Sequence, residues 1–276
     1  MNIVTISRLV GSYGDIIAAT VARKLGLELL GRDQVHELAE SCDPEFRDAC
    51  TAYENEHGPG FFERIFFDSP SYTSLFQALT YEAASRGKVV LVGRGAQIVL
   101  RDVPGILKVR VVAPPDVRTK RIMERYNFTR EEAEDFVRSY DHKRETLIRS
   151  IFHSDSNDWA LYDMIINTAH FTSGAASEVV LDALANLHRP ADVEAVTENL
   201  RNLAVAKRIE TIIRKKLTSS AAGNVLVNME PTGVVTLSGK ILDKKGKMKA
   251  EKMALEYPGV VEVVNELKVT ELSFHY

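Results

Sequence analysis

Residues 6–26 read ISRLVGSYGDIIAATVARKLG, and this stretch decides the fold. An apolar strand runs into a turn that contains Gly11 and Gly14, and the turn runs into a helix that ends near Gly26. Backbone N–H groups at the start of such a helix bind anions, and glycines allow the ligand to approach closely. We therefore interpret Gly11-Ser12-Tyr13-Gly14 as a candidate phosphate-binding loop.

The loop lacks two parts of the motif G-x-x-x-x-G-K-[ST], namely the lysine and the hydroxyl that contacts magnesium. Lys24 is the next lysine, and it lies roughly 15 Å further along the helix, which is too far to substitute. Asp15 complements the helix dipole but would repel a nearby phosphate. A strand-to-helix turn capped by Ser12 is the alternative interpretation, and the loop alone does not decide between the two.

The first part of the chain alternates short apolar runs with helical stretches. Strands that are apolar on both faces and alternate with helices indicate a parallel sheet covered on two sides. We predict an α/β domain over residues 1–188, with a five-stranded parallel sheet and helices on both faces. The predicted strands are NIVTIS, LELL, KVVLVG, ILKVRVVA and YDMIIN.

A helical insertion of roughly 55 residues between the second and third strands exceeds a normal crossover and suggests a flap on the substrate side. Asp43-Pro44 would begin one of its helices, and Ser69-Pro70 would begin another that ends near Gly87. We interpret FFERIFF, residues 61–67, as core or a packing face, with an exposed dimer contact as the alternative. Further along, Thr129 and Glu132 have the spacing of a capping box.

The pattern changes after Pro190. Residues 189–199 are predicted to be a linker, and residues 200–276 to form a small α+β domain of order αββαβ. The expected helices cover about 200–217 and 244–257. NVLVNME and VVTLSG flank a glycine turn and predict a hairpin, and VVEVVNELKV predicts a last strand. Because this part shows no phosphate loop, metal cluster or nucleophile, we expect the chemistry in the first domain.

Composition narrows the class of protein. The chain has 276 residues, 45% of them hydrophobic and 26% charged, with a formal net charge of −3. This charge gives no reason to expect nucleic acid or an anionic membrane as a non-specific partner. We find neither a signal peptide nor a run of apolar residues long enough to span a membrane, so we expect a cytoplasmic protein. Cys42 and Cys50 are expected to be buried thiols.

Arginines follow the strands where ligands of open α/β sheets bind. Arg8 ends the first strand, Arg94 follows the third, and Arg32 follows the second, although Arg32 could equally be a solvated turn residue. Arginine grips phosphate with two parallel hydrogen bonds, so these cations could replace the missing lysine.

Two later helices carry further arginines. Arg118, Arg121 and Arg125 share one helix face, which would be unremarkable if it were solvated. Arg144 falls inside the apolar stripe of the next helix. A buried cation needs a partner, which could be Asp141 or a bound anion.

Five ordered motifs resemble those of the cytidylate kinase-like family of P-loop nucleoside monophosphate kinases: VTISRxxGSxG, VLVGRGAxxxL, VxxxAPxxxRxxRIxER, DxxR and WxxYDxxINT. The resemblance spans about residues 3–185. Residues from about 200 to 270 resemble a BON domain through GVVTLSG and GVVEVVNELKV. The expected fold is therefore a P-loop nucleoside monophosphate kinase-like domain followed by a BON-like domain.

The resemblance implies transfer of the terminal phosphoryl group of ATP, with Mg²⁺, to CMP, dCMP or a related monophosphate. Such transfer depends on positioning and charge neutralisation. It implies a catalytic role for Arg8, Arg144 and Asp141, and acceptor binding by Arg32 and Arg94. It assigns no protein ligand to the metal. The residues expected to hold the ATP phosphates are Gly11, Ser12, Tyr13, Gly14, Asp15, Arg118 and Arg121.

A second hypothesis is a nucleotide-binding regulator with weak or no catalysis that signals through the BON-like domain. Tyr13, Asp15 and the missing hydroxyl at Ile16 motivate it. In either case the expected partners are nucleotides. The BON-like domain would contact another protein or a membrane surface, and a homo-oligomer is compatible with the sequence. A weaker third hypothesis is an interaction protein that binds no nucleotide.

Overall fold

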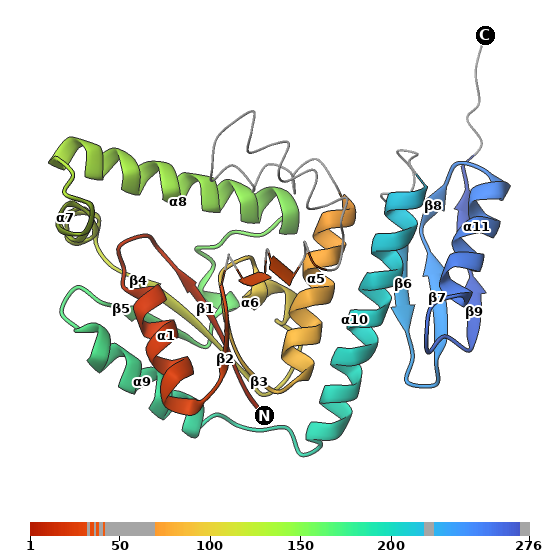
Figure 1. The fold of residues 1–276 in the computed structure, drawn as a ribbon, viewed down its shortest axis with the longest axis horizontal. Helices are drawn as coiled ribbons and strands as arrows, with labels where there is room; N and C mark the ends of the chain where they lie inside the picture. Colours follow the sequence, from red (N-terminus) through yellow and green to blue (C-terminus); the bar gives the residue numbers. More distant parts are fainter. Residues whose placement is uncertain (32–33, 36, 39–40, 42–69, 218–223, 271–276) are drawn as a thin grey trace, which may run out of the picture. The chain divides into compact units, whose positions relative to one another are not determined.

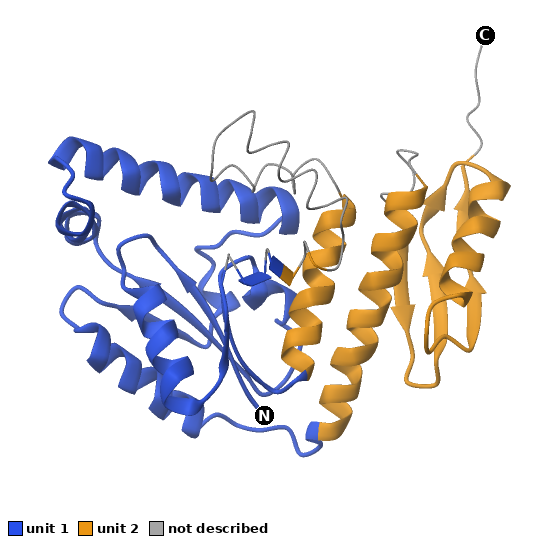
Figure 2. Ribbon diagram, in the orientation of Figure 1, with its two compact units in different colours: residues 1–37, 86–193 blue, residues 38–85, 194–276 orange. Residues whose placement is uncertain are grey.

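The structure is a computed structural model, and it describes the chain except for residues 32–33, 36, 39–40, 42–69, 218–223 and 271–276 (Figure 1). Arg32, Cys42, Cys50, the helix expected from Asp43 and the FFERIFF stretch lie outside the described residues. Two compact units make up the chain (Figure 2): residues 1–37 with 86–193, and residues 38–85 with 194–276. Each unit is described by itself.

A five-stranded sheet is the centre of the first unit. Its order is β2-β3-β1-β4-β5, and all neighbours are parallel. This confirms the predicted sheet. The strands are β1 Asn2–Arg8, β2 Glu28–Leu30, β3 Lys88–Val92, β4 Ile106–Val112 and β5 Met164–Asn167.

Helices follow the strands of this unit in alternation. They are α1 Gly14–Leu25, α6 Ala96–Val99, α7 Pro115–Tyr126, α8 Arg130–Phe152, the 3₁₀ turn η1 Trp159–Leu161 and α9 Ser173–Ala185. The capping box at the start of α8 is confirmed, because Thr129 and Glu132 exchange the expected side chain to backbone bonds. α1 ends at Leu25 and is capped by Gly26, which adopts the left-handed conformation (φ 60°).

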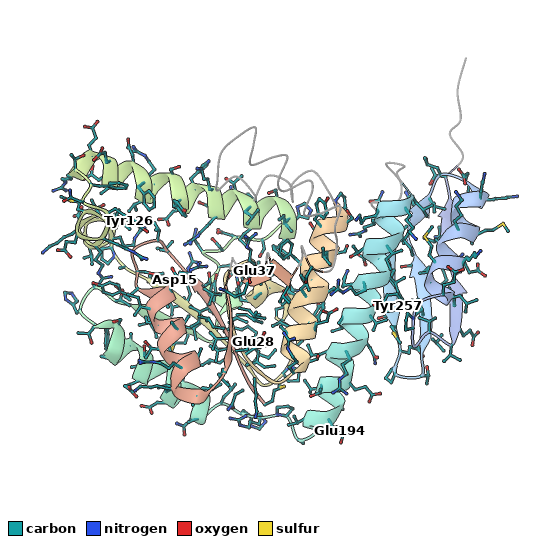
Figure 3. The ribbon with its side chains drawn as sticks, viewed as in Figure 1. Asp15, Glu28, Glu37, Tyr126, Glu194 and Tyr257 are labelled. Carbon is teal, nitrogen blue, oxygen red and sulfur yellow. The ribbon has the colours of Figure 1, made fainter. Side chains whose placement is uncertain are left out.

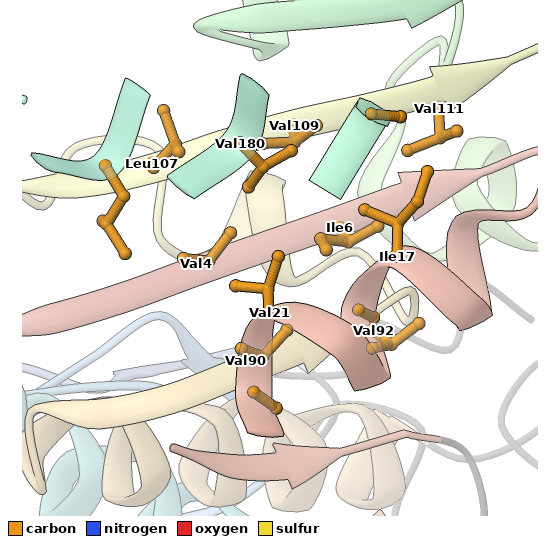
Figure 4. Packing of buried hydrophobic residues seen from close by; sticks show 14 of the residues in the cluster. Val4, Ile6, Ile17, Val21, Val90, Val92, Leu107, Val109, Val111 and Val180 are labelled. Carbon is orange, nitrogen blue, oxygen red and sulfur yellow. The ribbon is translucent and has the colours of Figure 1, made fainter. Parts of the chain in front are cut away.

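Side-chain alternation along β1 divides the sheet into two different faces. Val4 and Ile6 are fully buried on the face that contacts α1 and α9, where they meet Ile17, Val21 and Val180 (Figure 4). The intervening residues Thr5 and Ser7 point to the opposite face because strand side chains alternate. The apolar face fixes α1, and therefore the loop before it, against the carboxyl end of β1.

The second unit combines two long helices with small sheets. β6 and β7 form the expected antiparallel hairpin, and β9 pairs with β7 in parallel. β8 and β10 form a separate two-stranded parallel sheet. The elements are α5 Pro70–Ser85, α10 Val193–Lys216, β6 Leu226–Met229, β7 Val234–Ser238, β8 Lys240–Ile241, α11 Lys244–Leu255, β9 Glu262–Asn265 and β10 Lys268–Val269.

Two details of this unit differ from the sequence prediction. α10 begins at Val193, inside the stretch predicted to be a linker, because Val196 and Leu200 are buried at helical spacing. The single last strand is in fact two, β9 and β10, which pair with different strands. The domain boundaries at residues 188 and 200 stay a prediction.

Polar groups join α5 to α10 within this unit. Arg208 donates to both carboxylate oxygens of Glu82, at 2.6 and 2.9 Å. Glu210 is fully buried and accepts from the Ser74 hydroxyl and from two cations on its own helix. Burial lowers the pKa of one of these cations, Arg214, despite the neighbouring carboxylate. Across the described part of the chain, no helix combines the length and apolar character that membrane crossing requires.

Candidate functional site

The loop after β1 presents backbone amides at the start of α1. Tyr13 is the residue before the helix and adopts the left-handed conformation (φ 68°), and Gly11 has φ 75°. Among the described residues, none accepts a hydrogen bond from the N–H groups of Gly14, Asp15 or Ile16. The first intrahelical bond comes from Ile17. These three N–H groups, at the positive end of the helix, are suited to bind an anion.

The carbonyl oxygens of the same loop are held by arginines. Each of three guanidinium groups donates one bond to the backbone here. Arg144 donates to the carbonyl of Arg8, the last residue of β1 (3.0 Å), and within the loop Arg118 donates to that of Val10 (3.2 Å) and Arg121 to that of Gly11 (3.1 Å). A carbonyl oxygen that faced a phosphate would repel it. The three bonds fix the carbonyls on cations and so leave the amide side of the loop for a ligand.

Arg8 lies across the loop where a P-loop lysine is missing. A Cβ at Gly14 would lie 2.8 Å from Arg8 Cγ and closer still to its Cβ, so the arginine stem occupies the space beside Gly14. A Cβ at Gly93 would overlap Arg8 Nη1. The guanidinium also pairs with Asp15 at 2.8 Å. Gly14 and Gly93 therefore form a slot for the Arg8 side chain, and this slot places the guanidinium next to Asp15 at the start of α1.

Asp141 connects α8 to the loop. Its carboxylate accepts from the Val10 amide (3.3 Å) and from the Arg118 guanidinium (2.6 Å). Arg118 is 5% exposed and also donates from Nε to the Ala113 carbonyl. The expectation placed Asp141 beside Arg144, and the structure adds Arg118 as its ion-pair partner. Asp141 and Arg118 therefore bind the amide and the carbonyl of Val10, respectively, and fix the backbone of the loop at this residue.

Tyr13 and Ser12 have roles in the loop that the sequence did not reveal. The Arg121 guanidinium lies 3.8 Å from the centre of the Tyr13 ring, a cation–π distance. Ser12 does not cap α1, because its hydroxyl donates to the Leu9 carbonyl at 2.7 Å and Tyr13 is the N-cap residue. The hydroxyl and the backbone carbonyl of Thr168 both accept hydrogen bonds from the Arg121 guanidinium. The loop is thereby fastened to the end of β5.

The loop after β3 has an unusual backbone. Gly93, Arg94 and Gly95 all have positive φ, at 74°, 59° and 73°. A Cβ at Gly95 would lie 2.7 Å from Phe152 Cζ and closer still to Cε2, and the positive φ itself strains any other residue, so both features favour glycine at this position. A non-glycine residue at positive φ between two glycines is strained, and such strain gathers at functional sites. Arg94 is thus fixed at the carboxyl edge of the sheet, as the sequence predicts for a ligand-binding position.

A cavity of about 310 Å³ opens beside the loop. Gly11, Gly14 and Ile16 line one side, and Arg121 and Arg125 of α7 line the other. Figure 3 labels Asp15 at the start of α1 and Tyr126 at the end of α7, the two helices that border the cavity. Its volume lies at the lower end of the range for small-molecule sites.

The residues predicted from the sequence fall into three groups. Those brought together around the loop are Arg8, Gly11, Ser12, Tyr13, Gly14, Asp15, Arg118, Arg121, Asp141 and Arg144. Arg94 is next to Gly93, which borders Arg8, while Arg32 lies outside the described residues. Sequence reasoning missed Thr168 and Arg110. A cation within the apolar run ILKVRVVA was the available signal for Arg110.

Comparison with known proteins assigns both parts of the chain. Residues 3–170 match the cytidylate kinase-like family, and residues 206–271 match the BON domain. The cytidylate kinase of Archaeoglobus fulgidus is 28% identical over 188 residues, covering 66% of this chain and 93% of that protein. The cytidylate kinase of Halobacterium salinarum is 30% identical over 183 residues, covering 66% and 88%.

A solved structure supports the fold alone. A protein of Eubacterium ventriosum superposes with a TM-score of 0.53 at 19% identity, covering 67% of this chain and 99% of that one. The family match spans more than half of the sequence and includes the Gly11–Gly14 loop, the loop after β3, and helices α7 and α8. This chain therefore belongs to the cytidylate kinase-like family, and it carries a BON domain in its C-terminal part.

Proposed function

We propose that this protein is a nucleoside monophosphate kinase that transfers the terminal phosphoryl group of ATP to CMP, dCMP or a related monophosphate. The observation that carries the proposal is the loop at Gly11–Gly14. Its amides at the start of α1 are unbonded within the described residues, while guanidinium groups hold its carbonyls. Phosphoryl transfer relies on such fixed donors more than on covalent chemistry by the protein.

Each group has a distinct part in the proposed reaction. The amides of Gly14, Asp15 and Ile16 would hold ATP phosphates, and Arg8 would supply the cation that a P-loop lysine normally supplies. Arg94 would hold the phosphate of the acceptor. An oxygen of that phosphate would attack the terminal phosphorus of ATP as its bond to ADP breaks, and the surrounding arginines would stabilise the charge that spreads over the transferred group.

The described residues of this site offer Mg²⁺ at most one protein ligand. Among the described residues there is no cluster of three or more side chains suited to a metal, and the Ser12 hydroxyl is bonded to a carbonyl. Asp15 is an exposed carboxylate at the loop. Mg²⁺ is commonly held by one or two carboxylates together with phosphates and water, so Asp15 could contribute a single ligand. The ion would neutralise phosphate charge.

The alternative is a nucleotide-binding regulator that turns over slowly or not at all. It is favoured by the ion pair between Arg8 and Asp15, since a nucleotide phosphate must compete with this carboxylate for the guanidinium. The BON domain would then report nucleotide occupancy to a protein or a membrane surface.

A coupled assay of ADP release, with Mg·ATP and each of CMP, dCMP, UMP and AMP, separates the two functions, and calorimetry reports binding independently. The kinase proposal expects turnover with at least one acceptor, and loss of turnover in Arg8→Met. Arg101→Met is the matched control, because Arg101 is exposed and pairs with its neighbour Asp102. ATP binding without turnover on any acceptor would overturn the kinase and leave the regulator.

A further inference from the structure

Arg110 is a buried cation in the middle of the first unit. It lies on β4, pairs in register with Ser7 of β1 and is 5% exposed. Its guanidinium donates to the hydroxyls of Ser7 (3.1 Å) and Tyr162 (3.0 Å) and to the side-chain oxygen of Asn157 (3.0 Å). Because Val109 and Val111 belong to the apolar core on the opposite face, Arg110 belongs to the face that carries Ser7.

All the hydrogen-bond acceptors of this guanidinium are neutral. Within the described part of the chain, no carboxylate forms an ion pair with Arg110, whereas Arg118 pairs with Asp141 and Arg8 with Asp15. The Tyr162 ring, 5.4 Å from the guanidinium carbon, adds a modest cation–π attraction. Burying a charge without a counter-charge opposes folding. The charge is therefore better explained by a ligand of opposite sign than by stability.

Pairing across the sheet places Arg110 beneath the phosphate-binding edge. Ser7 lies between Arg110 on β4 and the Gly93 segment after β3, whose amide donates to the Ile6 carbonyl. Adjacent strands are about 4.8 Å apart, so the backbones of Arg110 and Gly93 are separated by roughly 10 Å. Arg8 and Arg94 directly follow Ser7 and Gly93. On the same face, Gln97 of α6 donates to the Tyr162 hydroxyl.

We propose that Arg110 is a positioning residue whose buried charge attracts a nucleotide phosphate bound above the ends of β1 and β3. It acts through the electric field and through Ser7, which it orients, and it is not proposed to touch the reacting atoms. The inference rests on the proposed function only in taking a nucleotide as the ligand. The attraction itself requires an anion and no turnover.

Removing the charge of Arg110 should weaken nucleotide binding without lowering the stability of the fold. In Arg110→Met the neighbouring hydroxyls keep partners, because Tyr162 also donates to the Ser156 carbonyl and lies within hydrogen-bond distance of Ser7. We expect a thermal midpoint without ligand that equals or exceeds that of the wild type. We also expect affinity to fall about tenfold, the order of effect of one charge at roughly 10 Å in a protein interior.

Calorimetry and thermal shift on the full chain, with CMP and with Mg·ATP as separate arms, measure both quantities. A lower affinity for CMP would show that Arg110 attracts the acceptor phosphate, and a lower affinity for Mg·ATP would show that it attracts the donor phosphates. Arg110→Lys, which keeps the charge, should retain most of the affinity, and Arg101→Met is the surface control. Binding does not require catalysis, so a protein that binds but does not turn over would contradict the kinase and leave this inference standing.

Two results would overturn the proposal. One is an Arg110→Met protein that fails to fold or melts well below the wild type, since the charge would then serve the fold. The other is unchanged affinity for both nucleotides.

Discussion

The substitution Gly14→Ala probes the slot that positions Arg8. Gly14 has an ordinary φ, so alanine fits the backbone and would by itself favour the helix by about 0.5–1 kcal/mol. The added methyl group, however, would lie 2.8 Å from Arg8 Cγ and 3.5 Å from Val111 Cβ. The crowded atom is near the backbone of Arg8 and cannot swing away freely. Overpacking of this kind costs about 1–3 kcal/mol.

The guanidinium must move to relieve the overlap. If its charge retreats from about 4 Å to about 8 Å from a bound phosphate, the attraction falls from ~4 to ~2 kcal/mol at an effective dielectric constant near 20. A loss of ~2 kcal/mol corresponds to roughly a thirtyfold weaker affinity for ATP. Calorimetry measures this affinity, and thermal unfolding measures the packing strain.

Gly174→Ala is the matched control. Gly174 also lies in the first turn of a helix, α9, and a Cβ there meets nothing closer than the Thr172 hydroxyl at 3.9 Å. We expect this variant to be as stable as the wild type or slightly more stable, with unchanged ATP affinity. If Gly14→Ala bound ATP as tightly as the wild type and melted at the same temperature, the assignment of Arg8 to this slot would be refuted.

Three further outcomes are expected. Asp141→Asn should lower the free energy of unfolding by about 2–4 kcal/mol in urea titrations, because Arg118 would remain buried without its counter-charge; a loss below 0.5 kcal/mol would contradict this. Hydrogen bonds from Thr129 lower the pKa of Glu132, so its stabilising contribution should be present near neutral pH and lost as the pH falls through the folded-state pKa, whereas Glu132→Gln should lack that part of the pH dependence in thermal melts. Glu210→Gln should destabilise the second unit by about 2–4 kcal/mol, as seen by denaturant unfolding, because two cations lose a buried partner; equal stability would show that they are solvated.

The sheet of the first unit was predictable because its signals are local. Apolar β-branched runs, the Thr129–Glu132 capping box and the glycine after α1 each act within a few residues, and the structure confirms each of them. The start of α10 was missed because Pro190 and five polar residues interrupt the apolar pattern over residues 190–199. The buried Val196 becomes visible only once the helix packs. The split between β9 and β10 depends on which strands pair, which is a long-range property.

The site was predictable as a set of arginines but not as a geometry. Topology alone gathers the residues that follow parallel strands, so Arg8 and Arg94 could be placed at one edge. The hydrogen-bond acceptor of each guanidinium depends on side-chain packing, and no sequence pattern indicates that Arg118 and Arg121 donate to loop carbonyls. Arg110 was overlooked because an isolated cation in a strand usually faces solvent.

The central claim is that backbone amides and Arg8 together hold a nucleotide phosphate where a lysine is absent. Its most direct test is nuclear magnetic resonance of the ¹⁵N-labelled protein during titration with Mg·ATP. We expect the largest shifts at the amides of Gly14, Asp15 and Ile16 and at the Arg8 guanidinium Nε, with the BON-domain signals moving little. ATP binding that leaves these four signals in place, or a failure of ATP to bind at all, would contradict the claim.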